Sequence, residues 1–326
     1  MRFVGWLWLG VPSAAMNDLW DKALDRSVAL GYTNIGYKLR SSDFVDLPSM
    51  KGKTAVITGA TGGLGEAAAK QMAALSADLV IVARNEAKAQ ATIDELRTAG
   101  VNAIYELADL SSMADVRDLT ERLLQLDRID VLVNNAGALF GERGRTDEGL
   151  ERTFALNLLS QYILTTGLLT LLERSAPARV VMVSSGGMYS EKVHPYDLEY
   201  QHGDYTGTSA YARTKRGQVI LTEEWAQAWK DKGVVVNAMH PGWAATPGVE
   251  ESLPTFRKIV GGFLRSPDQG ADTITFLAAA EEAGQRTGLF WHDRVVRPTH
   301  LRSATKESAE ERSAFLGELE RYASQT

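Results

Sequence analysis

From about residue 53 onward, short apolar runs alternate with longer amphipathic segments, and this alternation constrains the fold more than any other feature. The runs are "TAVITG" (54–59), "DLVIVAR" (78–84), "NAIYELAD" (102–109), "VLVNNAG" (131–137), "RVVMVSS" (179–185), "VVVNAMHPG" (234–242) and, as a seventh, "GLFWHD" (288–293). Continuous Val, Ile and Leu runs indicate strands buried on both faces, which parallel sheets contain. Repeated strand–helix units therefore predict an α/β fold, a doubly wound parallel sheet of about seven strands with helices on both faces.

The helices are expected after the first strand to about residue 75, and then over 86–98, 112–126, 148–172 and 209–230. No linker or low-complexity tract divides this block, so we predict one domain over residues 51–300. Residues 1–50 form a lead-in, and residues 301–326 form a polar tail with one or two amphipathic turns that pack on the domain surface.

Composition excludes several classes of function. The formal net charge is -6 and the arginines are scattered, so a nucleic-acid partner is not expected. There is no cysteine, which excludes disulfides, thiolate metal sites and cysteine nucleophiles. Five scattered histidines give no metal-site spacing, and we predict no metal. A cytoplasmic location is the expectation, because a chain without cysteine fits a reducing compartment.

The N-terminal stretch "MRFVGWLWLGVPSAAM" (1–16) leaves three interpretations open. It is apolar over about a dozen residues, whereas a membrane span needs about 20. Met16 as the true start, an interfacial segment that contacts a membrane, and a signal peptide all fit this pattern.

A glycine-rich turn, "TGATGGLG" (58–65), lies between the first predicted strand and helix. Gly59, Gly63 and Gly65 allow a tight turn and close approach of a ligand to the backbone, and the helix that follows directs its N-terminal N–H groups at that ligand. A pyrophosphate fits there, as in a Rossmann-type sheet, although the spacing is not G-x-G-x-x-G. The predicted cofactor-binding residues of this turn are Gly59, Thr61, Gly62, Gly63, Leu64 and Gly65.

The end of the second strand decides which nucleotide is expected. An acidic residue there would bind the 2′-hydroxyl of NAD, but the sequence reads Val-Ala-Arg-Asn with Arg84 in third place. An arginine suits a 2′-phosphate, because it is always charged and can bind in bidentate fashion. We therefore predict NADP(H) in preference to NAD(H), with Arg84 as the selective residue. A solvated charge at the strand end is the alternative.

These motifs, taken in order, resemble the short-chain dehydrogenases/reductases. The matching stretches are "TGATGGLG" (58–65), "ADL" (108–110), "NNAG" (134–137), "FALNLLS" around Asn157, "VSS" (183–185), "YARTK" (211–215) and "HPGWAAT" (240–246). They cover about residues 50–295. Further stretches such as "YILTTGLL" (162–169) and "RSPDQGADT" (265–273) resemble one subgroup of the family and extend the similarity to all but roughly the first twenty residues.

The resemblance implies four catalytic roles. Tyr211 would be the general acid/base, Lys215 its activator, Ser185 the hydroxyl that orients the carbonyl, and Asn157 the anchor of a water relay. It also implies further cofactor contacts, at the adenine by Asp109 with Leu110, on the ribose side by Asn135, Ala136 and Gly137, and at the nicotinamide by Pro241, Gly242 and Thr246. Family members often associate through their long helices, so the resemblance also implies that this chain can form a homo-oligomer.

The Tyr–Lys spacing of four suits this chemistry, because residues one helical turn apart share a face. Hydride transfer to a carbonyl leaves an oxygen that needs a proton. A phenol has an ordinary pKa near 10, and a nearby ammonium is expected to lower that of Tyr211. A positioned acid/base contributes about 10²–10⁴ in rate.

Structural interpretations stay open at this point. The spacing of Tyr211 and Lys215 alone is weak, and Asn157 fits a satisfied core amide equally well. Asp109 fits an N-cap of the helix that begins near Ser112. The choice of Ser185 over Ser184 rests on the family alone.

The loop 186–208 is long for a compact domain, and loops of this length often bind ligands. We expect it to shape a substrate pocket together with segment 243–264, where Trp243, Leu253 and Phe256 offer apolar surface. The predicted function is an NADP(H)-dependent oxidoreductase that interconverts a carbonyl and an alcohol on a lipophilic small molecule. The alternatives are a nucleotide-binding sensor with little turnover and a sugar-nucleotide epimerase or dehydratase. Only about 85 residues follow the sixth strand, which disfavours the epimerase because those enzymes have a larger C-terminal domain.

Overall fold

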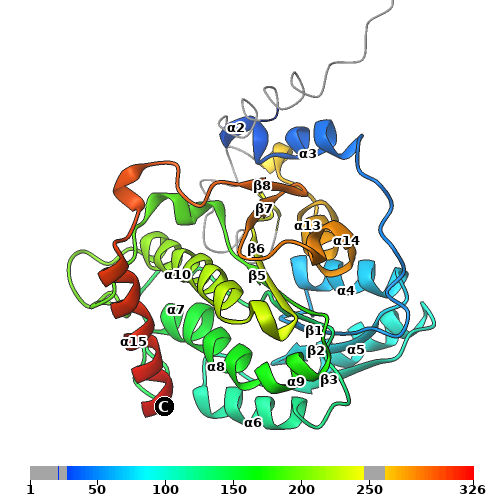
Figure 1. The fold of residues 1–326 in the computed structure, drawn as a ribbon, viewed down its shortest axis with the longest axis horizontal. Coiled ribbons are helices and arrows are strands. Elements are labelled where there is room, and N and C mark those ends of the chain that lie inside the picture. The colour runs from blue at the N-terminus through cyan, green and yellow to red at the C-terminus, as the bar shows by residue number, and fades with distance from the viewer. Residues whose placement is uncertain (1–20, 22–27, 246–260) are drawn as a thin grey trace, which may run out of the picture.

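Eight strands form one sheet. They are β1 (Thr54–Thr58), β2 (Asp78–Ala83), β3 (Ala103–Leu107), β4 (Val131–Asn134), β5 (Ala178–Val183), β6 (Val234–Met239), β7 (Phe290–His292) and β8 (Val295–Arg297). The structure is a computed structural model that describes residue 21, residues 28–245 and residues 261–326. The strand order is β3-β2-β1-β4-β5-β6-β7-β8, and all neighbours are parallel except β7 and β8 (Figure 1).

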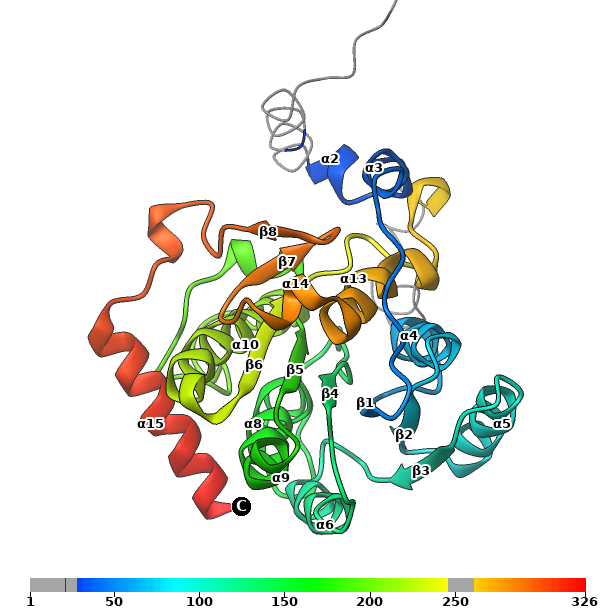
Figure 2. The ribbon, with the colours of Figure 1, turned by 45° about the vertical axis from the view of Figure 1, so that its right-hand side comes forward.

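Helices cover both faces of the sheet (Figure 2). One face carries α4 (Gly63–Ala74), α5 (Glu86–Arg97), α13 (Pro267–Ala279) and α14 (Glu281–Gly284). The other carries α6 (Met113–Leu123), α7 (Arg152–Phe154), α8 (Ser160–Gly167), α9 (Leu169–Arg174), α10 (Gly207–Ala228) and α15 (Ala309–Gln325). The lead-in contributes α2 (Val28–Gly31) and α3 (Asn34–Ser41).

Each strand feeds two hydrophobic cores because its side chains alternate between the faces. Within β1, Val56 packs in the core beneath α6, α8 and α10, whereas Ile57 packs in the core beneath α4, α5 and α13. Within β2, Val80 and Ile81 divide in the same way. Burial on both faces confirms the prediction of a doubly wound α/β sheet. The order reverses between β1 and β4, and open α/β sheets bind ligands at such a point.

The structure differs from the sequence-based expectation at two internal places. The sheet has an eighth strand, β8, which follows a turn of Asp293 and Arg294, both at positive φ. The helix expected over 148–172 is not one helix. A π-helical turn (Ala155–Leu159) separates α7 from α8, and a break at Leu168 separates α8 from α9. An extra residue in one helical turn leaves the apolar pattern almost unchanged, so the pattern does not reveal it.

The described part of the lead-in and the tail both pack against the sheet domain, and the boundaries at residues 50 and 300 stay predictions. The tail is more ordered than expected, since α15 has 17 residues and begins with a capping box formed by Ser308 and Glu311. Phe315 and Leu319 of α15 are buried in the core of α8 and α10. The predictions on residues 1–16 lie outside the described residues. Among the helices of the described ranges, none is long and apolar enough to cross a bilayer.

Candidate active site

The predicted site residues follow the ends of several parallel strands and so meet at one edge of the sheet. The glycine turn follows β1, Asn135 follows β4, Ser184 and Ser185 follow β5, and Pro241 lies just beyond β6. Tyr211 and Lys215 reach this edge from α10. The sheet therefore gathers residues from about 180 positions of sequence at its carboxyl edge, where open α/β sheets bind ligands.

The glycine turn forms a cradle for which side chains would be too large. Gly59 and Gly63 have φ of +67° and +56°, in the left-handed region that favours glycine. A Cβ on Gly65 would lie 2.3 Å from the carbonyl oxygen of Gly59 and 2.5 Å from Nδ2 of Asn135. Gly62 caps α4 without a side-chain hydrogen bond, and nothing lies within 4 Å of its Cβ position.

This cradle fits a phosphate group. The first N–H groups of α4 have no side-chain acceptor at their N-cap, and open space lies beside Gly62. Helix N-termini with such free N–H groups bind anions. Thr61 and Leu64, the other predicted residues of the turn, are half-buried beside it. The structure thus brings the six residues of this turn together as the sequence predicted, while their contact with a cofactor stays a prediction.

Asn135 holds the turn to the end of β4. Its Nδ2 donates to the carbonyl oxygens of Thr58 at 2.8 Å and of Gly59 at 3.2 Å. The N–H groups of Asn135 and Ala136 both donate to the hydroxyl of Thr58, at 3.0 and 2.9 Å. Asn135 therefore supports the cradle from behind, and Gly137 next to it is exposed.

Arg84 and Asp109 flank the adenine side of the predicted site. Arg84 is exposed directly after β2, and its side chain makes no hydrogen bond or ion pair with the described residues. Asp109 accepts from the N–H and hydroxyl of Ser111 at 2.9 and 2.7 Å. The N-cap of α6 is Ser112, so the alternative that Asp109 caps this helix is wrong. Leu110 beside it is buried in the core.

Asn157 lies in the π-helical turn and is fully buried. Its side chain accepts from the N–H of Ala138 and donates to the carbonyl oxygen of Ala138, both at 2.9 Å. It also donates to the Thr214 hydroxyl on α10 at 3.3 Å. Asn157 is therefore a satisfied core amide that joins the loop after β4 to α10. π-helical turns are frequent at functional sites, and this one places Asn157 beside α10, the helix of the predicted Tyr211 and Lys215.

The two serines after β5 have different surroundings. The Ser184 hydroxyl is buried and donates to the backbone carbonyl of Lys215 at 2.9 Å. The Ser185 side chain accepts from the N–H of Gly187 at 3.1 Å and hydrogen-bonds the Tyr211 phenol. Ser184 therefore ties strand to helix, whereas Ser185 faces the tyrosine. This geometry supports the choice of Ser185 that the sequence alone left open.

Lys215 is 2% exposed, and its Nζ lies 5.3 Å from the ring centroid of Tyr211. Nζ donates to the carbonyl oxygen of Val183 at 2.8 Å. A Cβ on Gly137 would lie 3.3 Å from Nζ and 3.1 Å from Oδ1 of Asn157, so a side chain at this position would crowd the lysine.

The expectation that Lys215 lowers the pKa of Tyr211 is wrong for the protein in this state. Burial raises the pKa of the Tyr211 phenol to about 12, and the Ser185 hydrogen bond opposes that rise. Burial also lowers the pKa of the Lys215 ammonium to about 7. Desolvation disfavours the charged form of both groups, so their proximity alone does not create a phenolate.

The loop after β6 borders the other side of the edge. Gly242 has φ of +73°, and a Cβ there would lie 2.5 Å from Nε of Arg265. The Pro241 carbonyl oxygen accepts from Nη1 of Arg265 at 3.2 Å. Thr246, with Leu253 and Phe256, lies outside the described residues. The structure thus places Pro241 and Gly242 at the edge and gives no position for Thr246.

The structure adds residues that sequence reasoning missed. Arg265 is 1% exposed and donates to the carbonyl oxygens of Gly31, Tyr32 and Thr33 in the lead-in. It also pairs with Asp293 through two hydrogen bonds of 2.5 and 2.8 Å. The only sequence signal was that "RSPDQGADT" belongs to the subgroup pattern, which assigns no role to the arginine.

Tyr32 brings the lead-in to the rim of the site. Its carbonyl oxygen accepts from the N–H of Trp243 at 2.7 Å, and its ring lies 4.6 Å from that of His240. A Cβ on Gly186, the residue after Ser185, would lie 2.7 Å from the Tyr32 ring. The lead-in therefore packs directly against both loops that flank the predicted catalytic residues.

The loop 186–208 is anchored to α10. The Arg213 guanidinium lies 3.5 Å from the ring centroid of Tyr200 and within 3.9 Å of the Glu191 and Asp197 carboxylates. Arg213, between Tyr211 and Lys215 in sequence, therefore points to the loop. Tyr196 at the loop tip is 80% exposed.

Comparisons with known proteins agree with this architecture. A family model described as short chain dehydrogenase matches residues 53–255. The chain is 38% identical over 301 residues to human Dehydrogenase/reductase SDR family member 12, across 90% of this chain and 94% of that protein. It is 33% identical over 266 residues to human Retinol dehydrogenase 14, across 75% of this chain and 79% of that protein. These matches confirm the resemblance inferred from the motifs.

Solved structures show the same fold. A Pseudomonas aeruginosa RhlG/NADP active-site complex aligns with a TM-score of 0.62 and 27% identity, over 74% of this chain and 94% of that one. A 3-ketoacyl-(acyl-carrier-protein) reductase from Brucella melitensis complexed with NADH aligns with a TM-score of 0.59 and 28% identity, over 74% of this chain and 96% of that one. One neighbour holds NADP and the other NADH, so they do not decide between the two cofactors.

Proposed function

This chain belongs to the short-chain dehydrogenase family, and from that premise we propose that it is an NADP(H)-dependent oxidoreductase interconverting a carbonyl and an alcohol on a lipophilic small molecule. The family acts as oxidoreductases on alcohols and carbonyls with a nicotinamide cofactor. The observation that carries the proposal is the joint placement of Ser185, Tyr211 and Lys215 beside the glycine cradle at one edge of the sheet.

The residues at this edge fit a dinucleotide. The N-terminal N–H groups of α4 would hold the pyrophosphate, and the ribose would lie near Gly137 and Lys215. Asp109 would contact the adenine, while Pro241 and Gly242 would border the nicotinamide. Such a cofactor supplies the hydride, and the chain's own residues supply the proton and the orientation.

Tyr211 is the acid of the reduction. Its raised pKa of about 12 keeps the phenol protonated near neutral pH, so it can give a proton to the oxygen that forms from the carbonyl. Ser185, which hydrogen-bonds the phenol, is placed to donate to the same oxygen and to orient it. Lys215 would gain its charge when the anionic cofactor lies beside it, because an opposite charge favours the ammonium. Asn157 fixes the loop after β4 against this helix.

The preference for NADP(H) rests on Arg84. It is exposed after β2, has no ion-pair partner among the described residues, and no carboxylate stands at the strand end. We expect Arg84→Ala to weaken NADPH binding about tenfold or more and to leave NADH binding nearly unchanged. Arg174→Ala, at the exposed end of α9 on the opposite edge, is the matched control. Equal affinities of the wild type for NADPH and NADH would refute the preference.

The lipophilic substrate is supported by the names of relatives, several of which are retinol dehydrogenases, and by Trp243 at the rim. The test is NADPH consumption with a panel of lipophilic aldehydes, ketones and quinones, with Tyr211→Phe in parallel. We expect the variant to lose about 10²–10⁴ in turnover while NADPH binding stays within a few fold. Activity that survives the change contradicts the role of Tyr211. Tight NADPH binding without turnover on any compound favours the nucleotide sensor instead.

The proposal includes an expectation for assembly. α15 covers α8 and α10. Phe315 packs against Gly217 of α10, and the ring centroids of Tyr322 and Phe154 are 5.0 Å apart. We therefore propose that any homo-oligomer uses surfaces other than this helical face. Sedimentation velocity on the full chain measures its oligomeric state. A dimer that dissociates when exposed residues of α8 and α10 are substituted would contradict this choice of surface.

A further inference from the structure

Large exposed apolar side chains gather at one end of the molecule, on the lead-in and its neighbours. Within the described residues, six of the ten such side chains lie there, namely Leu30, Ile35, Leu39, Val45, Phe263 and Val295. Leu39 is 60% exposed and Val45 is 74% exposed. We call these six residues the lead-in face. Scattered exposed apolar residues are ordinary, but a concentration of them marks an interaction site.

Several members of the lead-in face lie close to one another. Ile35 and Leu39 are one turn apart on α3, so they share one side of that helix. The Asn34 side chain donates to the Gly262 carbonyl at 3.5 Å, which puts the short helix of Phe263 (Gly261–Phe263) beside α3. Figures 1 and 2 show α2 and α3 at one end of the molecule, beyond β7 and β8.

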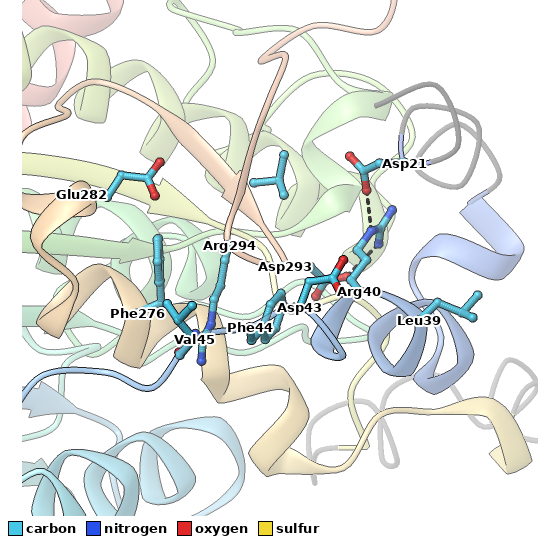
Figure 3. A pocket seen from close by; sticks show the side chains of 11 residues that line it. Asp21, Leu39, Arg40, Asp43, Phe44, Val45, Phe276, Glu282, Asp293 and Arg294 are labelled. Atoms are coloured by element: carbon cyan, nitrogen blue, oxygen red, sulfur yellow. Dashed lines mark hydrogen bonds and ion pairs between the residues drawn. The ribbon is translucent and has the colours of Figure 1, made fainter. Parts of the chain in front are cut away.

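A cavity of about 560 Å³ opens on the same face (Figure 3). Leu39, Val45 and Val295 of the lead-in face line it together with Phe44 and Phe276. The cavity lies between the lead-in and the turn after β7, away from Tyr211. Six charged side chains complete the lining, so the face is hollowed and its hollow is both apolar and charged; they are Asp21, Arg40, Asp43, Glu282, Asp293 and Arg294.

The charges around the face select the kind of partner. Lys38 is exposed between Ile35 and Leu39, but Asp43, Asp46 and Glu282 are exposed nearby, so the surroundings carry no basic excess. A strongly anionic partner would gain nothing there. The attraction comes from apolar area, which an electrically neutral partner satisfies.

The chain that leads into this face is itself apolar. Residues 3–11 read "FVGWLWLGV", with two tryptophans, and they precede α2 by fewer than twenty residues. Tryptophan is enriched at the boundary between membrane and water. Amphipathic segments with an apolar face lie in that boundary without crossing the bilayer.

We propose that the lead-in face binds the surface of a lipid bilayer. Binding of this face to lipid does not depend on the proposed oxidoreductase activity. Most of the face belongs to the same segment as Tyr32, whose ring packs against Gly186 beside Ser185.

The test is co-sedimentation of the full chain with phosphatidylcholine vesicles, with and without added phosphatidylserine, at low and high salt. We expect the wild type to bind both vesicle types alike, with little effect of salt. The double variant Ile35→Asp/Leu39→Asp should bind about tenfold or more weakly. The matched control is Ile104→Asp/Leu107→Asp, since these residues are 44% and 38% exposed on the distant strand β3. NADPH binding and the melting temperature verify that each variant is folded.

Three results would overturn the proposal. The wild type does not bind vesicles, or the Ile35/Leu39 variant binds as well as the wild type. In the third, deletion of residues 1–20 abolishes binding while the lead-in face variant does not, which assigns the contact to the N-terminal segment alone. Sedimentation velocity without lipid tests a second copy as occupant, since a dimer lost in the variant would assign the face to self-association.

Discussion

The buried lysine of the active site should make the stability of the protein depend on pH. Lys215 is 2% exposed and its Nζ is hydrogen-bonded to a neutral carbonyl oxygen, that of Val183. Burial lowers its pKa from 10.5 to about 7. Between these two values the unfolded chain holds a proton that the folded chain has released, so the free energy of unfolding rises with pH. Below pH 7 both states are protonated and the full cost of burying the charge is present.

The magnitude follows from the proton difference. One proton corresponds to about 1.36 kcal/mol per pH unit, so the contribution of Lys215 should rise by roughly 2–3 kcal/mol between pH 7 and pH 9. Urea denaturation of the cofactor-free protein at pH 7, 8 and 9 measures it. Lys215→Met keeps the bulk and removes the proton, so the difference in stability between wild type and variant isolates this side chain. Lys88→Met, at an exposed position of α5, is the control and should follow the wild type.

The difference in the free energy of unfolding between the wild type and Lys215→Met should therefore change with pH. A difference that stays constant from pH 7 to 9 refutes this reasoning. The ammonium would then remain charged in the folded protein, and a charged partner close to Nζ would have to exist. Saturating NADPH should also flatten the pH dependence, because its negative charge favours the ammonium.

Three further substitutions test the packing around the site. Gly65→Ala places a Cβ 2.3 Å from the Gly59 carbonyl oxygen and should weaken NADPH binding about tenfold. Fluorescence titration measures this affinity, and unchanged binding would show that the cradle is not needed. Arg265→Met leaves a buried Asp293 with one fewer partner and should cost about 3–5 kcal/mol. In a chain of 326 residues this lowers the melting temperature by roughly 4–7 °C, and a drop of only about a degree would contradict the importance of this ion pair. Phe315→Ala removes the main anchor of α15 and should lower the free energy of unfolding by about 3–5 kcal/mol, measured by urea denaturation. A smaller decrease would mean that α15 is not part of the cooperative core.

The sheet could be predicted from the sequence because its signals are local. Strands such as β1 and β5 are continuous apolar runs, and burial on both faces gives that pattern wherever the strand lies. The glycine turn is also local, since Gly59 and Gly63 need left-handed backbone that glycine adopts most easily. The meeting of these residues at one edge then follows from parallel order alone.

Other features depend on contacts that sequence patterns do not record. The distinction between Ser184 and Ser185 depends on which hydroxyl reaches a carbonyl of α10 and which faces Tyr211. The spacing of Tyr211 and Lys215 predicts their proximity correctly, but the direction of their pKa shifts depends on burial by many distant residues. A spacing gives a distance and not the polarity of the surroundings.

The region that matches the family model is shorter than the part of the chain that packs together. The matched region ends before Arg265 and begins after Tyr32, although these residues are joined by hydrogen bonds. A chain starting at residue 51 lacks the carbonyl oxygens of residues 31–33. These oxygens accept hydrogen bonds from the guanidinium of Arg265, which is 1% exposed. Each buried donor left without an acceptor costs about 1–3 kcal/mol, and a whole domain is stable by only about 5–15 kcal/mol.

We therefore expect the chain starting at residue 51 to melt far below the full chain or to be insoluble. A chain starting at residue 21 keeps these contacts and the ion pairs of Asp21 with Arg40 and Arg297, so it should melt close to the full chain. Thermal denaturation of the three chains measures the difference. If the chains starting at 21 and 51 melted at the same temperature, the lead-in would contribute nothing to the stability of the domain. If they differ as expected, Tyr32 and its neighbours are a structural part of the active-site rim, because the loops beside Ser185 and Gly242 pack directly on them.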